Sequence, residues 1–217
     1  MKPKLDDLAA VLSSLANSPE DRDWTANTLN ALDGKYALSQ KVSSEPGLAE
    51  IIKQLVGRVY QAYGTFAVLK GKRVLDIACG SSTSKAPSFI FVNTPFGESR
   101  IPIDSKSGYT AQFEPWFCRI LLELGADPVG IDLGNLDGET FEHYQVDLGQ
   151  PGALDFLPDH SFDAVQDSRL FGSPEFTAQF PNLADRLRIA AEIWRQEQRL
   201  LKTDGIVIHS DAANLIQ

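Results

Sequence analysis

The sequence contains few residues that could cross-link the chain or bind a metal ion. Its 217 residues include only two cysteines, Cys79 and Cys118, and three histidines that lie far apart. Two cysteines form no disulfide framework and no zinc-ligand spacing, and three scattered histidines form no metal cluster. We therefore expect a reducing, cytoplasmic environment and no metal site.

Long hydrophobic runs and an excess of basic charge are also missing. No segment approaches the roughly 18 consecutive apolar residues of a membrane span, and the start of the chain has no apolar signal core. The formal net charge of −9 opposes binding to phosphate backbones over a large surface. We expect neither a membrane nor a nucleic acid as a partner.

Apolar residues in the first third of the chain follow helical spacing. The pattern runs from about Leu5 to Gly64, with a break expected in the polar stretch 17–23. After Pro46 one apolar stripe predicts a helix that packs against the core: Leu48, Ile51, Ile52, Leu55, Val56, Val59, Tyr60 and Tyr63. We expect residues 1–70 to form an N-terminal helical extension and residues 71–217 to form the main domain.

The rest of the chain alternates between short apolar runs and helical segments. Five predicted strands are centred on Val74–Ile77, Pro128–Leu133, His143–Leu148, Ser161–Asp167 and Ile206–His209. Predicted helices cover 113–124 and 183–202, and residues 203–205 are expected to turn the chain into the last strand. Such alternation predicts a doubly wound, mostly parallel, Rossmann-like α/β sheet with the strand order 3-2-1-4-5.

A long segment separates the first predicted strand from the next helix. Two extended runs, Phe89–Val92 and Arg100–Asp104, flank the turn-forming residues 93–99 and predict a β-hairpin or irregular arm within 86–109. An arm at a ligand-binding edge serves as a lid or as a contact in a homodimer, and a surface insertion without function explains the pattern equally well.

Three aspartates, Asp76, Asp132 and Asp147, fall at the ends of three successive predicted strands. Each alone has an ordinary explanation, because aspartate is common at strand exits and helix caps. Together they bring three carboxylates to the edge of a parallel sheet where nucleotide-like ligands bind. A carboxylate after the second strand can accept both ribose hydroxyls, which leaves a nicotinamide dinucleotide and other adenosine ligands open.

The run Val74-Leu-Asp-Ile-Ala-Cys-Gly80 resembles the first motif of the class I S-adenosylmethionine-dependent methyltransferases, hh-D-h-G-x-G-x-G. The resemblance extends in register from about Lys70 to His209. It implies that four residues line the methionine part of S-adenosylmethionine: Asp76, Ala78, Cys79 and Gly80.

The same resemblance assigns the later strand exits. It implies that Asp132 binds the ribose with Leu133 beside the adenine, and that Asp147 accepts from the adenine amino group with Leu148 packed on the ring. The run Gln166-Asp167-Ser168 matches the fourth exit, where the family faces the methyl donor and the substrate, so Asp167 is a further expected cofactor contact.

The expected function is methyl transfer to an unidentified acceptor, with S-adenosylhomocysteine as the product. No Asn-Pro-Pro-Tyr or Asp-Pro-Pro-Tyr follows the fourth strand, and the charge is acidic, so a small-molecule acceptor is favoured over a protein or a nucleic acid base. Methyl transfer requires a base only when the acceptor must lose a proton. The sequence identifies no residue as a clear catalytic base. The two candidates for that role are Asp167 and His209.

Departures from the motif keep two alternatives open. Ala78 and Ser82 replace the first and third glycines, and only eight residues follow His209, where the family has another helix and two strands. These departures support one alternative, a degenerate cofactor-binding or interaction protein without methyltransferase activity. The other alternative is a dinucleotide-binding oxidoreductase, which Asp132 permits although the chain lacks G-x-G-x-x-G. We expect the N-terminal helices, the arm or a second subunit to cover the edge of the fifth strand.

Overall fold

The computed structural model describes residues 5–16, 18–81, 89–94, 97–102, 111–167, 170–171 and 173–216. The chain begins with four helices: α1 (Leu5–Leu15), α2 (Pro19–Tyr36), α3 (Leu38–Ser44) and α4 (Pro46–Tyr63). The predicted break over 17–23 is too long, because α2 already begins at Pro19. The side chain of Ser18 accepts from the backbone N–H of Asp21, and proline suits the first helical turn.

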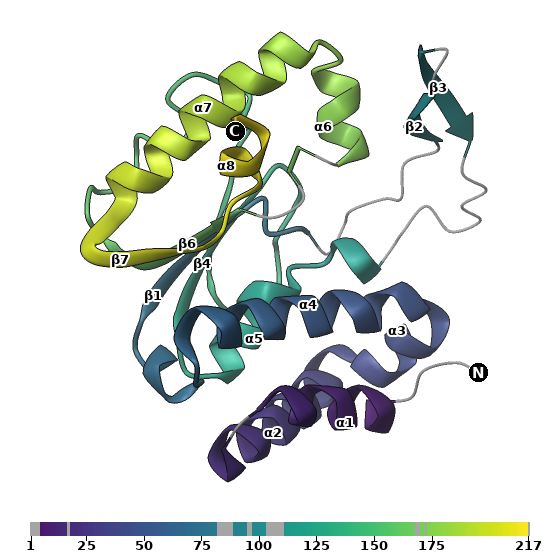
Figure 1. Ribbon diagram of the computed structural model, residues 1–217, viewed down its shortest axis with the longest axis vertical. Helices are drawn as coiled ribbons and strands as arrows, with labels where there is room; N and C mark the ends of the chain where they lie inside the picture. Colours follow the sequence, from purple (N-terminus) through teal and green to yellow (C-terminus); the bar gives the residue numbers. More distant parts are fainter. Residues whose placement is uncertain are drawn as a thin grey trace.

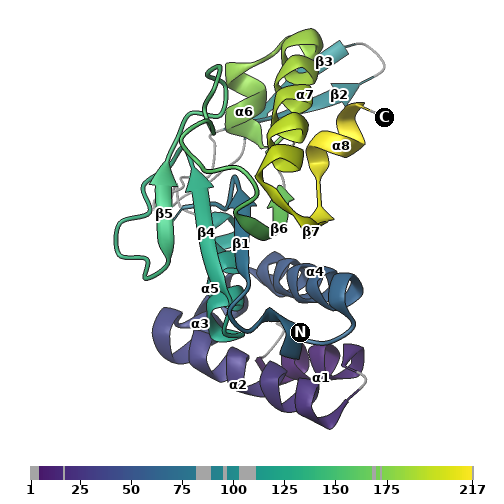
Figure 2. The ribbon, with the colours of Figure 1, turned by 90° about the vertical axis from the view of Figure 1, so that its left-hand side faces the viewer.

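Five strands form one parallel sheet with the order β5-β4-β1-β6-β7. The strands are β1 (Arg73–Ile77), β4 (Asp127–Asp132), β5 (Glu142–Gln145), β6 (Phe162–Asp167) and β7 (Leu201–His209). In chain order this is 3-2-1-4-5, which confirms the predicted Rossmann-like topology (Figure 2). The direction of winding changes between β1 and β6, so their carboxyl ends flank the crevice where such sheets bind ligands.

Helices cover both faces of the sheet (Figure 1). The remaining helical elements are η1 (Ala67–Leu69), η2 (Ala111–Phe113), α5 (Trp116–Glu123), α6 (Pro174–Gln179), α7 (Leu183–Leu200) and α8 (Asp211–Ile216). Helices α4 and α5 lie on one face with α1–α3 beyond them, and α7 lies on the other. The N-terminal helices share a core cluster with Val74 and Trp116, and the domain division at residue 70 stays a prediction.

Side chains in β1 alternate between the two faces. Val74 packs in the cluster formed with the N-terminal helices, whereas Leu75 and Ile77 pack in the cluster formed with α7. Asp76 is two residues after Val74 and therefore faces the α4 and α5 side. In β6 the Cα partner of Asp76 is Gln166, and the partner of Ile77 is Asp167. Gln166 and Asp167 thus point to opposite faces.

Two predicted boundaries are wrong. Helix α7 ends at Leu200 and β7 begins at the next residue, so residues 203–205 lie inside the strand and not in a turn before it. The pairing of β7 with β6 shifts its register between Phe162 and Ala164, which accommodates these residues. Strand β5 ends at Gln145, so Asp147 lies two residues beyond the strand.

The inserted segment contains the predicted hairpin. Strands β2 (Phe89–Thr94) and β3 (Gly97–Pro102) pair with each other in an antiparallel sheet of their own. Residues 86–88 and 103–109 of the predicted arm lie outside the described residues, and its role as a lid or subunit contact stays a prediction. Strand β7 pairs with β6 and with no further strand in the described part of the chain.

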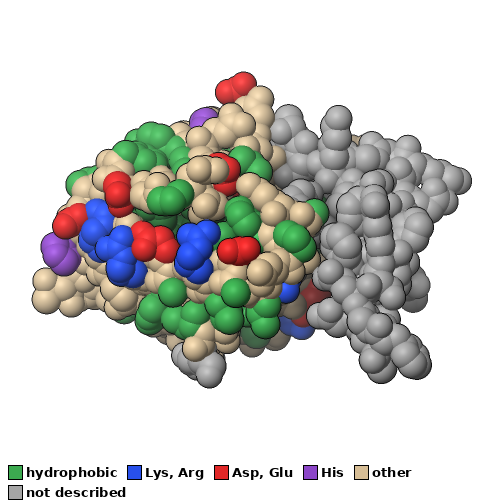
Figure 3. All heavy atoms as spheres, turned by 90° about the horizontal axis from the view of Figure 1, so that it is seen from above, with side chains coloured by type: hydrophobic (Ala, Val, Ile, Leu, Met, Phe, Trp, Pro, Cys, Tyr) green, Lys and Arg blue, Asp and Glu red, His purple; other side chains and the backbone are tan. Residues whose placement is uncertain are grey.

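No helix among the described residues is long and apolar enough to cross a membrane. On the face seen in Figure 3, acidic side chains alternate with lysine and arginine side chains across the described residues. Side chains of both charge signs are therefore interspersed on this face.

Candidate functional site

A cavity of about 390 Å³ lies at the carboxyl ends of the strands. Its polar lining follows the order of the sheet, from Asp147 after β5 through Asp132 in β4 and Asp76 in β1 to Gln166 in β6. The walls come from α4, from the segment η2–α5 and from α6. This volume is within the range of small-molecule sites. The sequence predicted that Asp76, Asp132 and Asp147 lie at this edge of the sheet, and in the structure all three line one cavity.

The loop after β1 has the backbone geometry of a tight ligand-binding turn. Ala78 and Gly80 both have positive φ, at 58° and 91°. A Cβ atom on Gly80 would lie 2.2 Å from the carbonyl oxygen of Phe113, so this position requires glycine. Ala78 adopts the left-handed conformation although the related motif has glycine there. Ser82 lies outside the described residues.

Asp132 holds this loop against the end of β4. Its carboxylate accepts from the backbone N–H of Gly80 at 2.9 Å and from that of Gly134 at 2.8 Å. Burial raises the pKa of Asp132, and the N–H groups of Gly134, Gly80 and Leu133 partly offset that rise. Each carboxylate oxygen has two lone pairs, so Asp132 retains acceptor capacity toward the cavity.

Asp147 and two leucines surround the β5 end of the cavity. Asp147 accepts from Gln150 Nε2 at 3.0 Å and from the backbone N–H of Gly149 at 2.9 Å. The bond from Gln150 is the main reason that its pKa lies below the usual value. Leu133 and Leu148 also line the cavity, and Leu133 is 52% exposed. An apolar side chain exposed beside a carboxylate suits a flat ring that carries an N–H donor.

Asp76 is buried at the floor of the cavity, with 2% of its surface exposed. Gln166 Nε2 donates to Oδ1 at 3.4 Å, and the thiol of Cys118 donates to Oδ2 at 3.7 Å. Burial raises the pKa of Asp76 to about 8, although both donors oppose the rise, and the charges of Asp132 and Asp167 add to it. The carboxyl group is therefore mostly protonated at pH 7 and ready to ionise beside a cation.

Cys79 and Cys118 are free thiols in contact beside this floor. Burial raises the pKa of Cys79 to about 11 and raises that of Cys118 as well. Both groups stay protonated at neutral pH and are poor nucleophiles. Cys79 lines the cavity, and its predicted contact with the cofactor stays a prediction.

The two candidate bases, Asp167 and His209, lie outside the lining of the cavity. Asp167 accepts from Ser210 Oγ at 2.8 Å and from the backbone N–H groups of Asp211 and Ala212 at the start of α8. The Nε2 atom of His209 lies 2.8 Å from the carboxylate of Asp211. Asp167 thus caps the start of α8. The predicted roles of Asp167 as a cofactor contact and of both residues as bases stay predictions.

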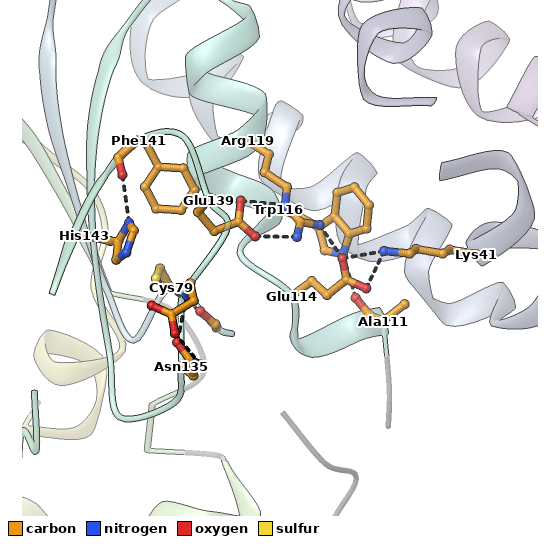
Figure 4. A network of polar contacts seen from close by, with 12 residues as sticks. Lys41, Cys79, Ala111, Glu114, Trp116, Arg119, Asn135, Glu139, Phe141 and His143 are labelled. Atoms are coloured by element: carbon orange, nitrogen blue, oxygen red, sulfur yellow. Dashed lines mark hydrogen bonds and ion pairs between the residues drawn. The ribbon is translucent and has the colours of Figure 1, made fainter. Parts of the chain in front are cut away.

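A buried ion network supports the wall formed by η2 and α5 (Figure 4). Glu114 lines the cavity and accepts from Lys41 Nζ at 2.6 and 2.7 Å and from Arg119. Arg119 also binds both oxygens of Glu139, at 2.6 and 3.2 Å, and its guanidinium lies 4.0 Å from the ring centre of Tyr36. These contacts join α2 and α3 to the wall, and sequence patterns reveal none of them.

The sequence also missed three apolar residues that line the cavity. Ile51 and Leu55 of α4 line the cavity with Phe113 of η2. The helical spacing of Ile51 and Leu55 correctly predicted a stripe that faces the core. Spacing alone does not show which residues of such a stripe reach a cavity.

The ionisable side chains that line the cavity are mainly carboxylic acids. Four carboxyl groups line the cavity, and its described lining contains no lysine, arginine or histidine: the acids are Asp76, Glu114, Asp132 and Asp147. Lys41 and Arg119 neutralise Glu114 from behind. Such a lining favours a ligand that carries positive charge and N–H or O–H donors, and it opposes a phosphate. The described residues contain no group of three or more possible metal ligands.

Comparison with known proteins leaves the family of the chain undetermined. No protein-family model matches the sequence, and no curated protein matches it. One solved structure that matches is Burkholderia thailandensis 1,6-didemethyltoxoflavin-N1-methyltransferase, with bound 1,6-didemethyltoxoflavin and S-adenosylhomocysteine. The identity is 15%, the TM-score is 0.33, and the match covers 94% of this chain and 64% of that one. A likeness at this TM-score carries no inference about what the present chain binds.

Proposed function

We propose that the protein is an S-adenosylmethionine-dependent methyltransferase that acts on a small molecule. The observation that carries the proposal is the row of three carboxyl groups, Asp147, Asp132 and Asp76, along one cavity beside a glycine turn. Three donor-bearing parts of S-adenosylmethionine match this row: the adenine amino group, the ribose hydroxyls and the ammonium group.

Each carboxyl group would hold one part of the cofactor. Asp147 accepts from the adenine amino group, with Leu133 and Leu148 beside the ring. Asp132 accepts from the ribose hydroxyls next to Gly80, whose missing Cβ lets the turn pack against the carbonyl oxygen of Phe113. Asp76 binds the ammonium group at the cavity floor. The residues present therefore fit the cofactor in both donor pattern and charge.

The charge of the lining separates this proposal from a dinucleotide-binding oxidoreductase. A nicotinamide dinucleotide carries a pyrophosphate with two negative charges, which sites stabilise with helix N-termini or cations. The described lining supplies four acids and no cationic side chain. S-adenosylmethionine instead brings a sulfonium and an ammonium group, which suit an acidic site.

The chain's contribution to methyl transfer would be alignment and exclusion of water. A sulfonium supplies an activated methyl group, and its transfer is an in-line displacement that depends on orientation. Ile51, Leu55 and Phe113 line the cavity with apolar side chains, which would help to exclude water around a bound cofactor. We propose a small acceptor, because the net charge of −9 disfavours a nucleic acid and no Asn-Pro-Pro-Tyr or Asp-Pro-Pro-Tyr follows the fourth strand.

Replacing Asp132 with alanine tests the ribose assignment. We expect the variant to bind S-adenosylhomocysteine about 1–3 kcal/mol more weakly, the scale of hydrogen bonds to a charged group. Isothermal titration calorimetry measures the change. Asp137→Ala, which removes an exposed aspartate from the same loop, is the matched control and should leave affinity unchanged. Equal affinity of folded Asp132→Ala and wild type would contradict the assignment.

Binding at pH 7 is expected to release about one proton, because an ammonium group beside Asp76 lowers its pKa from about 8. A ligand that favours the ionised form binds more tightly as the pH rises, so the affinity for S-adenosylhomocysteine should increase between pH 6 and 8. Titrations in buffers of different ionisation enthalpy count the protons. Asp76→Asn should abolish both the release and the pH dependence, and a wild type without either would exclude the Asp76 contact.

A further inference from the structure

Gln166 is a fully buried amide with one unpaired atom. The residue has 0% of its surface exposed and lines the cavity from β6. Its Nε2 donates to Asp76 Oδ1 at 3.4 Å, whereas Oε1 has no hydrogen-bond partner in the described part of the chain. A buried carbonyl oxygen without a donor is costly, and such atoms at a cavity wall point to a ligand donor.

A purely structural role for this amide would leave the cost of its desolvation uncompensated. Ala164, two residues earlier on the same face of β6, is part of the apolar core. An apolar side chain at position 166 would pack there without an unpaired oxygen. The glutamine instead places a neutral acceptor beside Asp76 and adds no second negative charge.

Gln166 and Asp76 form one acceptor pair on neighbouring strands. Their Cα atoms are register partners in the parallel pairing of β1 and β6, so the two side chains share a face of the sheet. Together they present a carboxyl group and a carbonyl oxygen to the cavity. A group with several N–H donors on one atom can reach both acceptors at once, and an ammonium group has three.

We propose that the side-chain carbonyl of Gln166 accepts a hydrogen bond from the ammonium group of the cofactor. Gln166 thereby selects ligands with an intact amino-acid end, in concert with Asp76. The inference rests on the proposed function, since it names a further binding residue in the same site.

The test compares two ligands that differ in their amino-acid end. S-adenosylhomocysteine has the ammonium group, whereas 5′-methylthioadenosine has the same adenosine and thioether without it. We expect Gln166→Met to weaken S-adenosylhomocysteine binding about tenfold and to leave 5′-methylthioadenosine binding within about twofold, by the scale of one hydrogen bond to a charged group. Gln166→Glu keeps a carbonyl acceptor and should retain most of the affinity. Gln54→Met, an exposed position on α4, is the control.

The outcomes separate this inference from the proposed function. Equal weakening of both ligands in Gln166→Met would show a structural role and overturn the inference, as would unchanged binding of S-adenosylhomocysteine. In both cases wild-type binding would leave the proposed function standing. If the folded wild type bound neither ligand, the proposed function would fall and the inference with it.

Discussion

Arg119→Met is expected to destabilise the fold by about 3–5 kcal/mol, the cost of leaving a buried ion pair with one partner. The guanidinium is buried between Glu114 and Glu139, and its removal leaves Glu139 without this counter-charge and Glu114 with Lys41. The variant also loses the stacking of the guanidinium on Tyr36. Urea unfolding monitored by circular dichroism measures the difference.

Two further variants show whether charge causes this loss. Adding Glu139→Gln to Arg119→Met should restore part of the stability, because it removes one uncompensated carboxylate. Arg195→Met breaks an exposed pair with Glu192 one helical turn away, and such pairs contribute little, so we expect no measurable change. A stability loss in Arg119→Met no larger than in Arg195→Met would contradict the role of the network.

Glu197→Gln is expected to stabilise the protein by an amount that grows with pH. Glu197 is fully buried in α7, and neither carboxyl oxygen has a well-formed hydrogen bond within the described residues. Burial, followed by the charge of Asp167, raises its pKa from 4.5 to about 9. Because the folded pKa is the higher one, stability is fully present below pH 4.5 and is lost as the pH rises toward 9.

The expected gain from Glu197→Gln is on the order of 3 kcal/mol at pH 7 and close to zero near pH 4. Unfolding free energies measured from pH 4 to pH 9 give the comparison. Glu192→Gln removes a carboxyl group from the same helix whose pKa is lowered, mainly by Arg195, and it should show no such alkaline gain. A pH-independent difference between Glu197→Gln and wild type would refute the buried, protonated state. Asp167 and Asp211 are the other acids near this group.

The fold and the three acids of the cavity were predictable because their signals are local. Apolar runs that end in aspartate mark the strands and the edge where the cavity lies, and the strand order follows the alternation with helices. The alternation of strands and helices along the chain does not show on which face of the sheet each side chain of a buried strand lies. In β6 almost every residue is buried, so no polar and apolar periodicity reveals the faces.

The placement of Asp167 illustrates that limit. Gln166 and Asp167 both lie at the exit of β6, and a one-residue difference decides which one faces the cavity. The pairing of β6 with β1 directs Gln166 to the side of Asp76 and directs Asp167 to α8. Contacts such as Arg119 with Glu139 and Tyr36 depend on tertiary packing, which spacing in the chain does not reveal.

Calorimetric titration of the wild-type protein with S-adenosylhomocysteine, S-adenosylmethionine and NAD⁺ tests the central claim most directly. The site predicts micromolar binding of the first two ligands, because both carry an ammonium group and adenosine donors for the acids of the lining. It predicts no binding of the dinucleotide, because the acidic lining opposes a pyrophosphate. Failure of the folded protein to bind either S-adenosyl ligand would contradict the cofactor site and favour an interaction protein without methyltransferase activity.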